Sequence, residues 1–349
     1  MLNFPNLLDF GKEISNGIDN FFDWFRNFFS FLFNFIKAIL EGSLNLIDDI
    51  FNDTPWWIWI IMIFIYVMFT YIIKDKKYKK LKTLSIITVF LVWIIIFNVL
   101  IKNPNINFNI KNTQTPWWIF IVLLFFISYK LHNYKTAITL SLLLVFIGVL
   151  GAWSAMLSTL SIIILSIIIS FIIGLPLGIL MAKSKRVEKV LKPILDMMQT
   201  IPTFVYLIPA VMLFSIGKVP ATFATIIYAV PPLVRLTSLG IQNVDEEMVE
   251  AGDSFGSTFW QMLFKIELPQ AISSIATGLN QTTMMAVAMV VTASMIGAGG
   301  LGQIVLDATN KNQIGNGFVG GFAIVALAII LDRLLSGLAS KYETKEGEI

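Results

Sequence analysis

Cysteine is absent from the 349 residues, and histidine occurs once, as His132. Without cysteine the chain can form no disulfide, no thiolate metal site and no cysteine nucleophile. A single histidine gives no basis for a histidine-based metal cluster or a Ser-His-Asp triad. We therefore expect no catalytic residues, no metal site and no cofactor in this chain.

Charge is also scarce. Asp, Glu, Lys and Arg make up 13% of the residues, against about 25% in soluble domains, and 56% of the residues are hydrophobic. The net charge of +3 is too small to favour nucleic acid as a partner. The first residues lack the basic stretch, apolar core and small-residue site of a cleavable signal peptide. The composition indicates an all-α polytopic membrane protein.

Residues 14–40 predict an amphipathic helix. Its polar residues recur every three or four positions and form one stripe, while the rest is rich in phenylalanine. This pattern is typical of a helix that lies in the bilayer interface, in contact with lipid. A poorly formed spanning helix interrupted by Arg26 is the alternative. We assign 1–53 to an outer amphipathic scaffold segment.

An internal repeat follows. The stretch TPWWIWI at 54–60 recurs as TPWWIFI at 115–121, with six identities in seven residues. Each copy opens a pair of apolar runs, at 56–73 with 82–101 and at 117–131 with 135–151, and its paired tryptophans suit the aromatic belt of a membrane interface. We interpret 54–151 as a duplicated helical hairpin.

Five longer apolar runs lie beyond the repeat, at 156–182, 194–214, 219–238, 270–297 and 317–338. Each is long enough to cross a hydrocarbon core of about 30 Å. With the duplicated hairpins this gives about nine crossings, so the two ends lie on opposite sides. If 245–269 is cytoplasmic, 18 of the 25 Lys and Arg are cytoplasmic as well. This asymmetry predicts an outer N-terminus and a cytoplasmic tail at 340–349.

The polar segment 245–269, DEEMVEAGDSFGSTFWQMLFKIELP, lies between two of these runs. Gly252 and Gly256 interrupt it, and we expect Leu268-Pro269 to close it, because a residue before proline is disfavoured in helical geometry. The segment predicts two short helices with a glycine corner, lying on a membrane surface. Its apolar positions recur at helical spacing: Val249, Phe255, Phe259, Met262, Leu263 and Ile266.

Part of this segment resembles a known motif. Glu250-Ala251, Gly256 and Leu268-Pro269 look like the EAA loop, which couples permease subunits of binding-protein-dependent ABC importers to their ATPases. Gly252 departs from the family pattern, which has Ala there. The resemblance assigns ATPase coupling to Glu250, Ala251, Gly252, Gly256, Leu268 and Pro269. The alternative is an amphipathic cytoplasmic loop of any transporter or channel.

Three further stretches are similar to permeases of the glycine betaine/proline type. They are GLPLGILMAKSKRVEKVLKPILDMMQTIPTFVYLIPAV at 174–211, AVPPLVRLTSLGIQ at 229–242 and ASMIGAGGLG at 293–302. The resemblance implies a type I ABC importer permease fold over 152–339. It also implies ATP-driven import of compatible solutes such as glycine betaine, proline betaine or carnitine, in the bacterial cell membrane, with a role in osmoprotection.

The resemblance further implies partners: a second copy of the chain, two ATP-binding subunits and an extracellular solute-binding protein. The chain has no G-x-x-x-x-G-K-[ST] motif, so ATP hydrolysis is expected in the separate subunit rather than here. Alternatives are a permease for another small solute (choline, methionine or related) and an ATP-independent channel or carrier. A membrane enzyme has little support, because the spans contain no paired carboxylates.

Candidate pathway residues come from the later spans. Asn280, Gln281, Thr282 and Thr283 form the most polar patch inside a span and should face either a dimer interface or a water-filled path. Phe204 and Tyr206 are aromatic candidates for a path that holds a quaternary ammonium group.

Other residues of these spans predict structural features. Pro202, Pro209, Pro231 and Pro232 predict kinks. The pairs Gly174/Gly178 and Gly317/Gly321 predict close helix contacts. Snorkelling would account for Asp196, Asp332 and Arg333, which lie near predicted span ends. Asp307 lies in an outer polar segment, 303–316, which is either a docking surface for a binding protein or a solvated loop.

Overall fold

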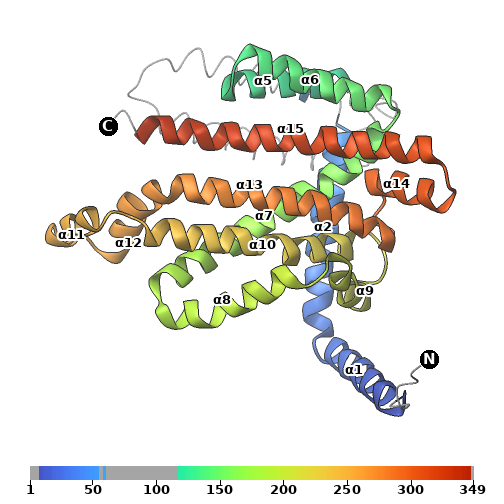
Figure 1. Cartoon of the computed structure of the whole chain (residues 1–349), viewed down its shortest axis with the longest axis horizontal. Helices are drawn as coiled ribbons and strands as arrows, with labels where there is room; N and C mark the ends of the chain where they lie inside the picture. The colour runs from blue at the N-terminus through green and yellow to red at the C-terminus, as the bar shows by residue number, and fades with distance from the viewer. Residues whose placement is uncertain (1–7, 55–57, 60–116, 347–349) are drawn as a thin grey trace, which may run out of the picture. The chain divides into compact units, whose positions relative to one another are not determined.

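The computed structural model describes residues 8–54, 58–59 and 117–346, and the regular elements in these ranges are helices (Figure 1). The all-helical prediction is confirmed. The chain divides into two compact units, one made of 1–45 and 127–349 and the other of 46–126. Apart from Ile58 and Trp59, the first copy of the predicted hairpin lies outside the described residues.

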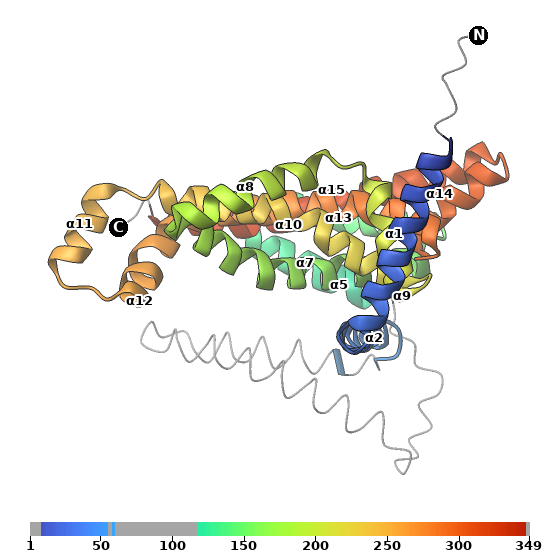
Figure 2. The same ribbon diagram turned by 90° about the horizontal axis from the view of Figure 1, so that it is seen from below.

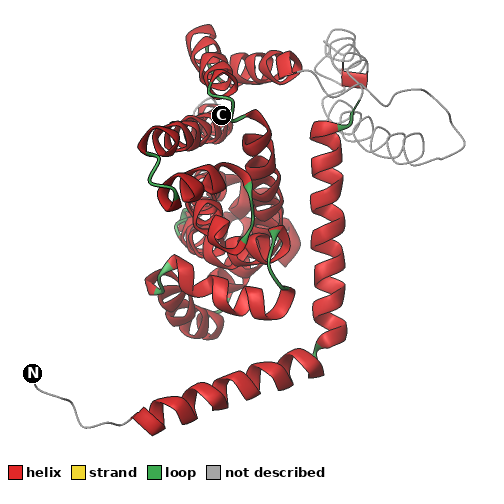
Figure 3. Ribbon diagram, turned by 90° about the vertical axis from the view of Figure 1, so that its right-hand side faces the viewer, coloured by secondary structure: helices red, strands yellow, loops and turns green. Residues whose placement is uncertain are grey.

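The N-terminal region forms two helices, α1 (Leu8–Phe28) and α2 (Ser30–Asn52), which meet at a bend (Figure 3). The single helix predicted for 14–40 is therefore wrong. Charged residues recur through α1, whereas α2 is long and apolar enough to span a membrane. The bend between Phe28 and Ser30 thus coincides with the change from a charged helix to an apolar one. Arg26 of α1 donates to the Met212 carbonyl at 3.5 Å, and the Phe33 and Phe214 rings lie 6.0 Å apart.

The second predicted hairpin corresponds to two helices, α5 (Trp117–Leu131) and α6 (Tyr134–Val149). Trp117 and Trp118 are exposed, as an interfacial position requires. At 15 and 16 residues, however, these helices extend only about 23 Å, which is less than a hydrocarbon core of about 30 Å. Their apolar composition alone therefore does not establish two full crossings.

Four predicted spans are confirmed as long helices: α7 (Trp153–Lys183), α10 (Lys218–Gln242), α13 (Leu268–Ala293) and α15 (Ile314–Glu346). Among the described residues, five helices including α2 meet the length and composition of a span, or six if one bent pair is counted. The predicted number of nine is not confirmed. It omitted α2, and it included two runs outside the described ranges.

The run at 194–214 is not one straight span. It belongs to α8 (Lys185–Thr200) and α9 (Leu207–Phe214), joined by a 3-10 turn at Thr203–Tyr206 and bent by 109°. Ile201, before Pro202, has ψ of 129°, because proline disfavours helical geometry in the preceding residue. The kink predicted at Pro202 is thus a complete break, whereas Pro231 and Pro232 lie inside the single helix α10.

The outer polar segment also differs from the prediction. Residues 303–316 are not a loop: α14 (Gly300–Asn310) is followed by a short turn into α15. Leu301 and Ala308 are buried and Asp307 is exposed, so the segment is an amphipathic helix with a short apolar face. The polar residues of this segment outnumber its apolar ones, so the helical spacing of the apolar residues was not recognised in the sequence.

The Gly317/Gly321 contact is wrong as well. A Cβ at Gly321 would meet nothing within 4 Å, and one at Gly317 would meet Ala308 only at an ordinary 3.7 Å. Gly320 is the close neighbour of α14, because its Cβ would come within 2.8 Å of Val305.

Helices α7, α10 and α13 form the centre of the larger unit and lie side by side in two views (Figures 1 and 2). Small residues allow their close approach. A Cβ at Gly178 of α7 would lie 2.5 Å from the Thr237 Cβ and 2.9 Å from the Val234 carbonyl oxygen of α10. A Cβ at Gly278 of α13 would lie 3.2 Å from the Leu233 Cα. The close contact predicted for Gly174/Gly178 is confirmed.

We expect Gly178→Ala to destabilise the protein by about 1–3 kcal/mol, because the added methyl group has no space between α7 and α10. Gly321→Ala is the matched control, since its methyl group meets nothing within 4 Å. It should be neutral or slightly stabilising. Thermal unfolding of the purified protein in detergent measures both, and equal unfolding temperatures would contradict the packing described here.

Candidate functional site

Residues 245–269 form a compact helical segment at one end of the central helices, opposite α14 (Figure 1). Helix α11 (Glu246–Ser254) begins at Asp245, whose carboxylate accepts from the Glu247 N–H at 3.0 Å. Helix α12 (Phe259–Met262) begins after Thr258, whose N–H donates to the Gln261 side chain at 2.8 Å. The predicted pair of short helices is confirmed.

A corner at 255–257 joins the two helices. Gly256 has φ of +69°, the left-handed conformation that side chains disfavour. Its N–H donates to the Asp253 carbonyl at 2.9 Å, and the Ser257 N–H donates to the Gly252 carbonyl at 3.1 Å. A Cβ at Gly256 would meet nothing within 4 Å, so backbone conformation, and not space, is what requires glycine.

Gly252 packs against the second half of the segment. A Cβ there would lie 2.7 Å from the ends of the Met262 and Ile266 side chains. Both are flexible tips that can shift, so an alanine, the residue of the family pattern, fits at little cost. The departure at Gly252 leaves the geometry of the corner intact.

The expected closure of the segment at Leu268-Pro269 is wrong. A π-helical turn, Leu263–Glu267, runs directly into α13, and Leu268 has helical angles. The Leu268 N–H donates to the carbonyl of Leu263, five residues earlier. Pro269 has no N–H to donate, so it fits near the start of α13, where the wider turn precedes it. One continuous helical path therefore connects α12 to α13.

The segment presents two kinds of side chain outward. Five acids are exposed, and all lie on α11 or its cap: Asp245, Glu246, Glu247, Glu250 and Asp253. Ala251 is also exposed. Four aromatic residues are exposed at and after the corner: Phe255 (90%), Trp260 (64%), Phe264 (60%) and Phe259 (52%). Large aromatic side chains exposed together are typical of a docking site for another protein.

An ion pair on the inner side of the segment joins it to α7. Glu267, in the π turn, pairs with Lys183, the last residue of α7. The Glu267 side chain is 5% exposed and that of Lys183 is 30% exposed. The same ammonium group lies 5.8 Å from the centroid of the Phe259 ring. One cation thus contacts both α12 and the turn that follows it.

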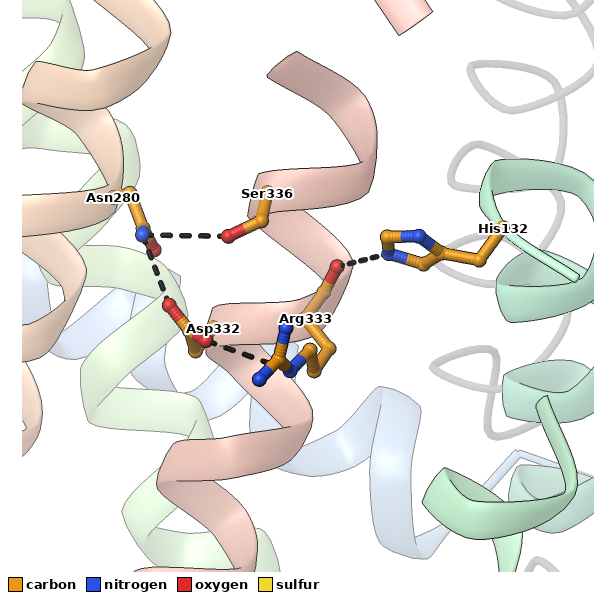
Figure 4. A network of polar contacts seen from close by, with 5 residues as sticks. All are labelled: His132, Asn280, Asp332, Arg333 and Ser336. Atoms are coloured by element: carbon orange, nitrogen blue, oxygen red, sulfur yellow. Dashed lines mark hydrogen bonds and ion pairs between the residues drawn. The ribbon is translucent and has the colours of Figure 1, made fainter. Parts of the chain in front are cut away.

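The four residues of the polar patch at 280–283 differ in burial and in the elements that they contact. Thr282 and Thr283 are buried, and Gln281 is exposed. Asn280 points toward α15, where its amide donates to Asp332 at 2.9 Å and approaches the Ser336 hydroxyl at 3.5 Å (Figure 4). Within one chain, three of the four residues therefore pack inside the fold, and Gln281 alone of this patch is free to face a partner or a path.

All three charged residues attributed to snorkelling have polar partners within the fold, including an ion pair of 3.9 Å between Arg333 and Asp332. Asp332 accepts from Asn280, and Asp196 of α8 pairs with Arg235 of α10. A charge in a spanning helix is stabilised by a partner on a neighbouring helix, which the sequence does not reveal. Arg333 is 59% exposed, and its carbonyl accepts from His132 Nε2 at 2.7 Å (Figure 4).

The aromatic candidates lie in the 3-10 turn after the break at Pro202. Phe204 is 55% exposed. Tyr206 is half-buried: its hydroxyl donates to the Met198 carbonyl, and its ring lies 5.9 Å from that of Tyr228. The structure therefore places Tyr206 against α8 and α10, whereas Asn280 faces α15.

Sequence reasoning missed the Lys183–Glu267, Asp196–Arg235 and Asn280–Asp332 contacts. One signal was available for the first. Glu267 lies four residues after Leu263, on the face that packs inward, so an acid there needs a cation nearby. The other two pairs join residues that are 39 and 52 positions apart, and the local sequence around their members carries no such signal.

Comparison with known proteins gives one family match and several relatives. The family described as "Binding-protein-dependent transport system inner membrane component" matches residues 174–343. The chain is 50% identical to the glycine betaine/carnitine transport permease protein GbuB of Listeria monocytogenes, over 66% of this chain and 83% of the relative.

Two further relatives are similar over comparable lengths. The glycine betaine/proline betaine permease protein ProW of Salmonella typhimurium is 49% identical, over 61% of this chain and 60% of the relative. The glycine betaine permease protein OpuAB of Bacillus subtilis is 41% identical, over 69% of this chain and 82% of the relative.

We expect Asn280→Ala to lower the free energy of unfolding by about 1 kcal/mol, because it leaves the Asp332 carboxylate without its donor on α13. Gln281→Ala, at the exposed neighbouring position, is the control and should have little effect. Thermal unfolding in detergent compares the two variants. A larger loss for Gln281→Ala would place the important polar contact outside the single chain.

Proposed function

Because the chain belongs to the family of binding-protein-dependent transport system inner membrane components, we propose that it is the membrane-spanning subunit of an ATP-driven importer of compatible solutes. The substrate class is that of glycine betaine, proline betaine and carnitine. The support is the match to permeases whose names specify these solutes, at 41–50% identity. The chain itself is a transporter subunit and not an enzyme.

Segment 245–269 is, in this proposal, the surface that binds the ATP-binding subunit. The observation that supports this role is its exposed combination of five acids on α11 and its cap with aromatics at and after the corner. Aromatic side chains fill pockets on a partner, and acids select a basic rim. ATP-driven closure of two such subunits then moves the segment and switches the path between outward and inward access.

Two copies of the chain form the path. Polar and charged side chains within spanning helices are costly against lipid, so the exposed ones belong at a dimer interface or a water-filled path. Gln281 and the half-exposed Asp196–Arg235 pair are the candidates among the described residues. Phe204, exposed on the adjoining turn, is the aromatic candidate for contact with the quaternary ammonium group of the solute.

Other functions have less support. Choline or methionine importers share the general loop, but the relatives above carry betaine and carnitine in their names, and a relative that also carries choline in its name is less similar, at 31% identity. An ATP-independent channel gives no reason for a segment of exposed acids and aromatics outside the spans. Solute selection at high affinity is assigned to a separate extracellular binding protein, which the family description includes as a component of the system.

We expect Gly256→Val to lower glycine betaine uptake, and betaine-stimulated ATP hydrolysis, at least tenfold in the reconstituted complex. A β-branched residue is strained at φ of +69°, so the corner between α11 and α12 changes shape. Gly256→Asn is the matched control, because asparagine tolerates the left-handed region and should retain most of the activity.

Uptake is measured in proteoliposomes that contain the chain, its ATP-binding subunit and its solute-binding protein. Choline and methionine serve as competing solutes, and betaine must be the preferred one. Normal stimulated ATP hydrolysis by Gly256→Val, with the complex intact, would remove the coupling role from this segment.

Orientation is tested through single cysteines, for which the cysteine-free chain is a ready background. Ser254 ends α11, Asn312 follows α14, and both are exposed; these two helices lie at opposite ends of the central helices (Figure 1). In our proposal the C-terminus and Ser254 are cytoplasmic, and the N-terminus and Asn312 are outside. Asn312→Cys should react with an impermeant maleimide in intact cells, and Ser254→Cys only after permeabilisation. The reverse pattern would invert the topology.

A further inference from the structure

Movement of segment 245–269 must reach the spanning helices if it is to open or close a path, and the structure offers few direct routes. The segment continues into α13 through the π turn and is preceded by α10. Its contact with α7, the third central helix, runs through the C-terminal end of α7. An apolar cluster formed by Ile241, Leu263 and Ala271, with Ile179 and Ala182 of α7, lies at this junction. Apolar contacts of this kind are not directional and allow sliding.

The Lys183–Glu267 ion pair is directional. Glu267 is 4% exposed, and its second oxygen, Oε2, is buried without a hydrogen-bond partner among the described residues. The carboxylate therefore depends on Lys183 to compensate its charge, since a buried acid without a partner cation is strongly disfavoured. Any movement that separates the two groups carries this penalty.

Lys183 also contacts both parts of the segment, the π turn and α12. Its ammonium group binds the carboxylate of the π turn and lies 5.8 Å from the Phe259 ring of α12. It is the last residue of α7, and Gly178, little more than one turn earlier, fixes α7 tightly against α10. A shift of α12 and the π turn therefore acts on α7 through a single residue, Lys183.

We propose that Lys183 and Glu267 are positioning residues that transmit the movement of segment 245–269 to α7. This inference rests on the proposed function, because it assumes that an ATP-binding subunit moves the segment. Glu267 is buried and Lys183 only partly so, and an ion pair of this kind adds little net stability compared with apolar packing but fixes one geometry. Its contribution is therefore to coupling more than to folding.

The test compares variants in proteoliposomes with the ATP-binding subunit and the solute-binding protein, using glycine betaine as the solute. The readout is the number of solute molecules imported per ATP hydrolysed, together with the unfolding temperature of the complex. We expect Glu267→Gln to lower this ratio about fivefold or more while the ATP-binding subunit still co-purifies. Lys183→Arg keeps the charge and should retain the ratio.

The exchanged pair Lys183→Glu with Glu267→Lys should recover at least half of the wild-type ratio, since it restores the ion pair with its direction reversed. Lys185→Met is the matched control: it removes an exposed cation two residues away, at the start of α8. It should leave the ratio unchanged. If the double variant does not fold, Lys183→Gln against Lys183→Arg makes the same comparison.

A wild-type ratio in Glu267→Gln would overturn the proposal. So would a fall in unfolding temperature and yield with an unchanged ratio, because that result describes a structural role only. A different outcome concerns the proposed function itself: wild-type complex that neither imports glycine betaine nor hydrolyses ATP in response to it. The two failures are distinguished by the wild-type measurement.

Discussion

Close approach between α7, α10 and α13 is the constraint on which the rest of the structure depends. Lipid is as apolar as a leucine side chain, so helices in a membrane are held together by packing and polar contacts instead of by exclusion from water. Glycines remove the side chains that would separate them: Cβ atoms at Gly178 of α7 and Gly240 of α10 would come within 2.5 and 2.6 Å of the neighbouring helix. The segment that leaves α10 and returns through α13 is thereby held at both ends by a rigid support.

Polar pairs then fix how the surrounding elements sit on this centre. Asn280–Asp332 connects α13 to α15, Asp196–Arg235 connects α8 to α10, and Lys183–Glu267 connects α7 to the π turn. Each pair joins two different helices, so each selects a rotation as well as a distance. Apolar surfaces alone would leave these rotations poorly specified, which explains why a chain with so few charges uses several of them in contacts between helices.

The sequence predicted the long helices and the corner at Gly256 because both have strong local causes. An apolar run of sufficient length has few alternatives to a spanning helix, and glycine between two polar helical stretches favours a turn. It failed where polarity was taken for a loop, at α14, and where hydropathy concealed a backbone break, at Pro202. Contacts such as Asn280–Asp332 depend on the arrangement of distant helices, so no local pattern contains them.

The π turn at Leu263–Glu267 has a consequence for how this region can change in evolution. Such a turn holds one residue more than an α-helical turn, and each residue of an α-helix corresponds to about 100° of rotation and 1.5 Å of length. Loss of one residue within Leu263–Glu267 would convert the π turn to an ordinary α-helical turn and leave the aromatic row of Phe259, Trp260 and Phe264 on the same side, whereas loss of one residue from the α-helical start of α13 would rotate the row by about 100° relative to the rest of α13. A partner that fits the aromatic row therefore constrains the number of residues at the start of α13 more strictly than the number in the π turn.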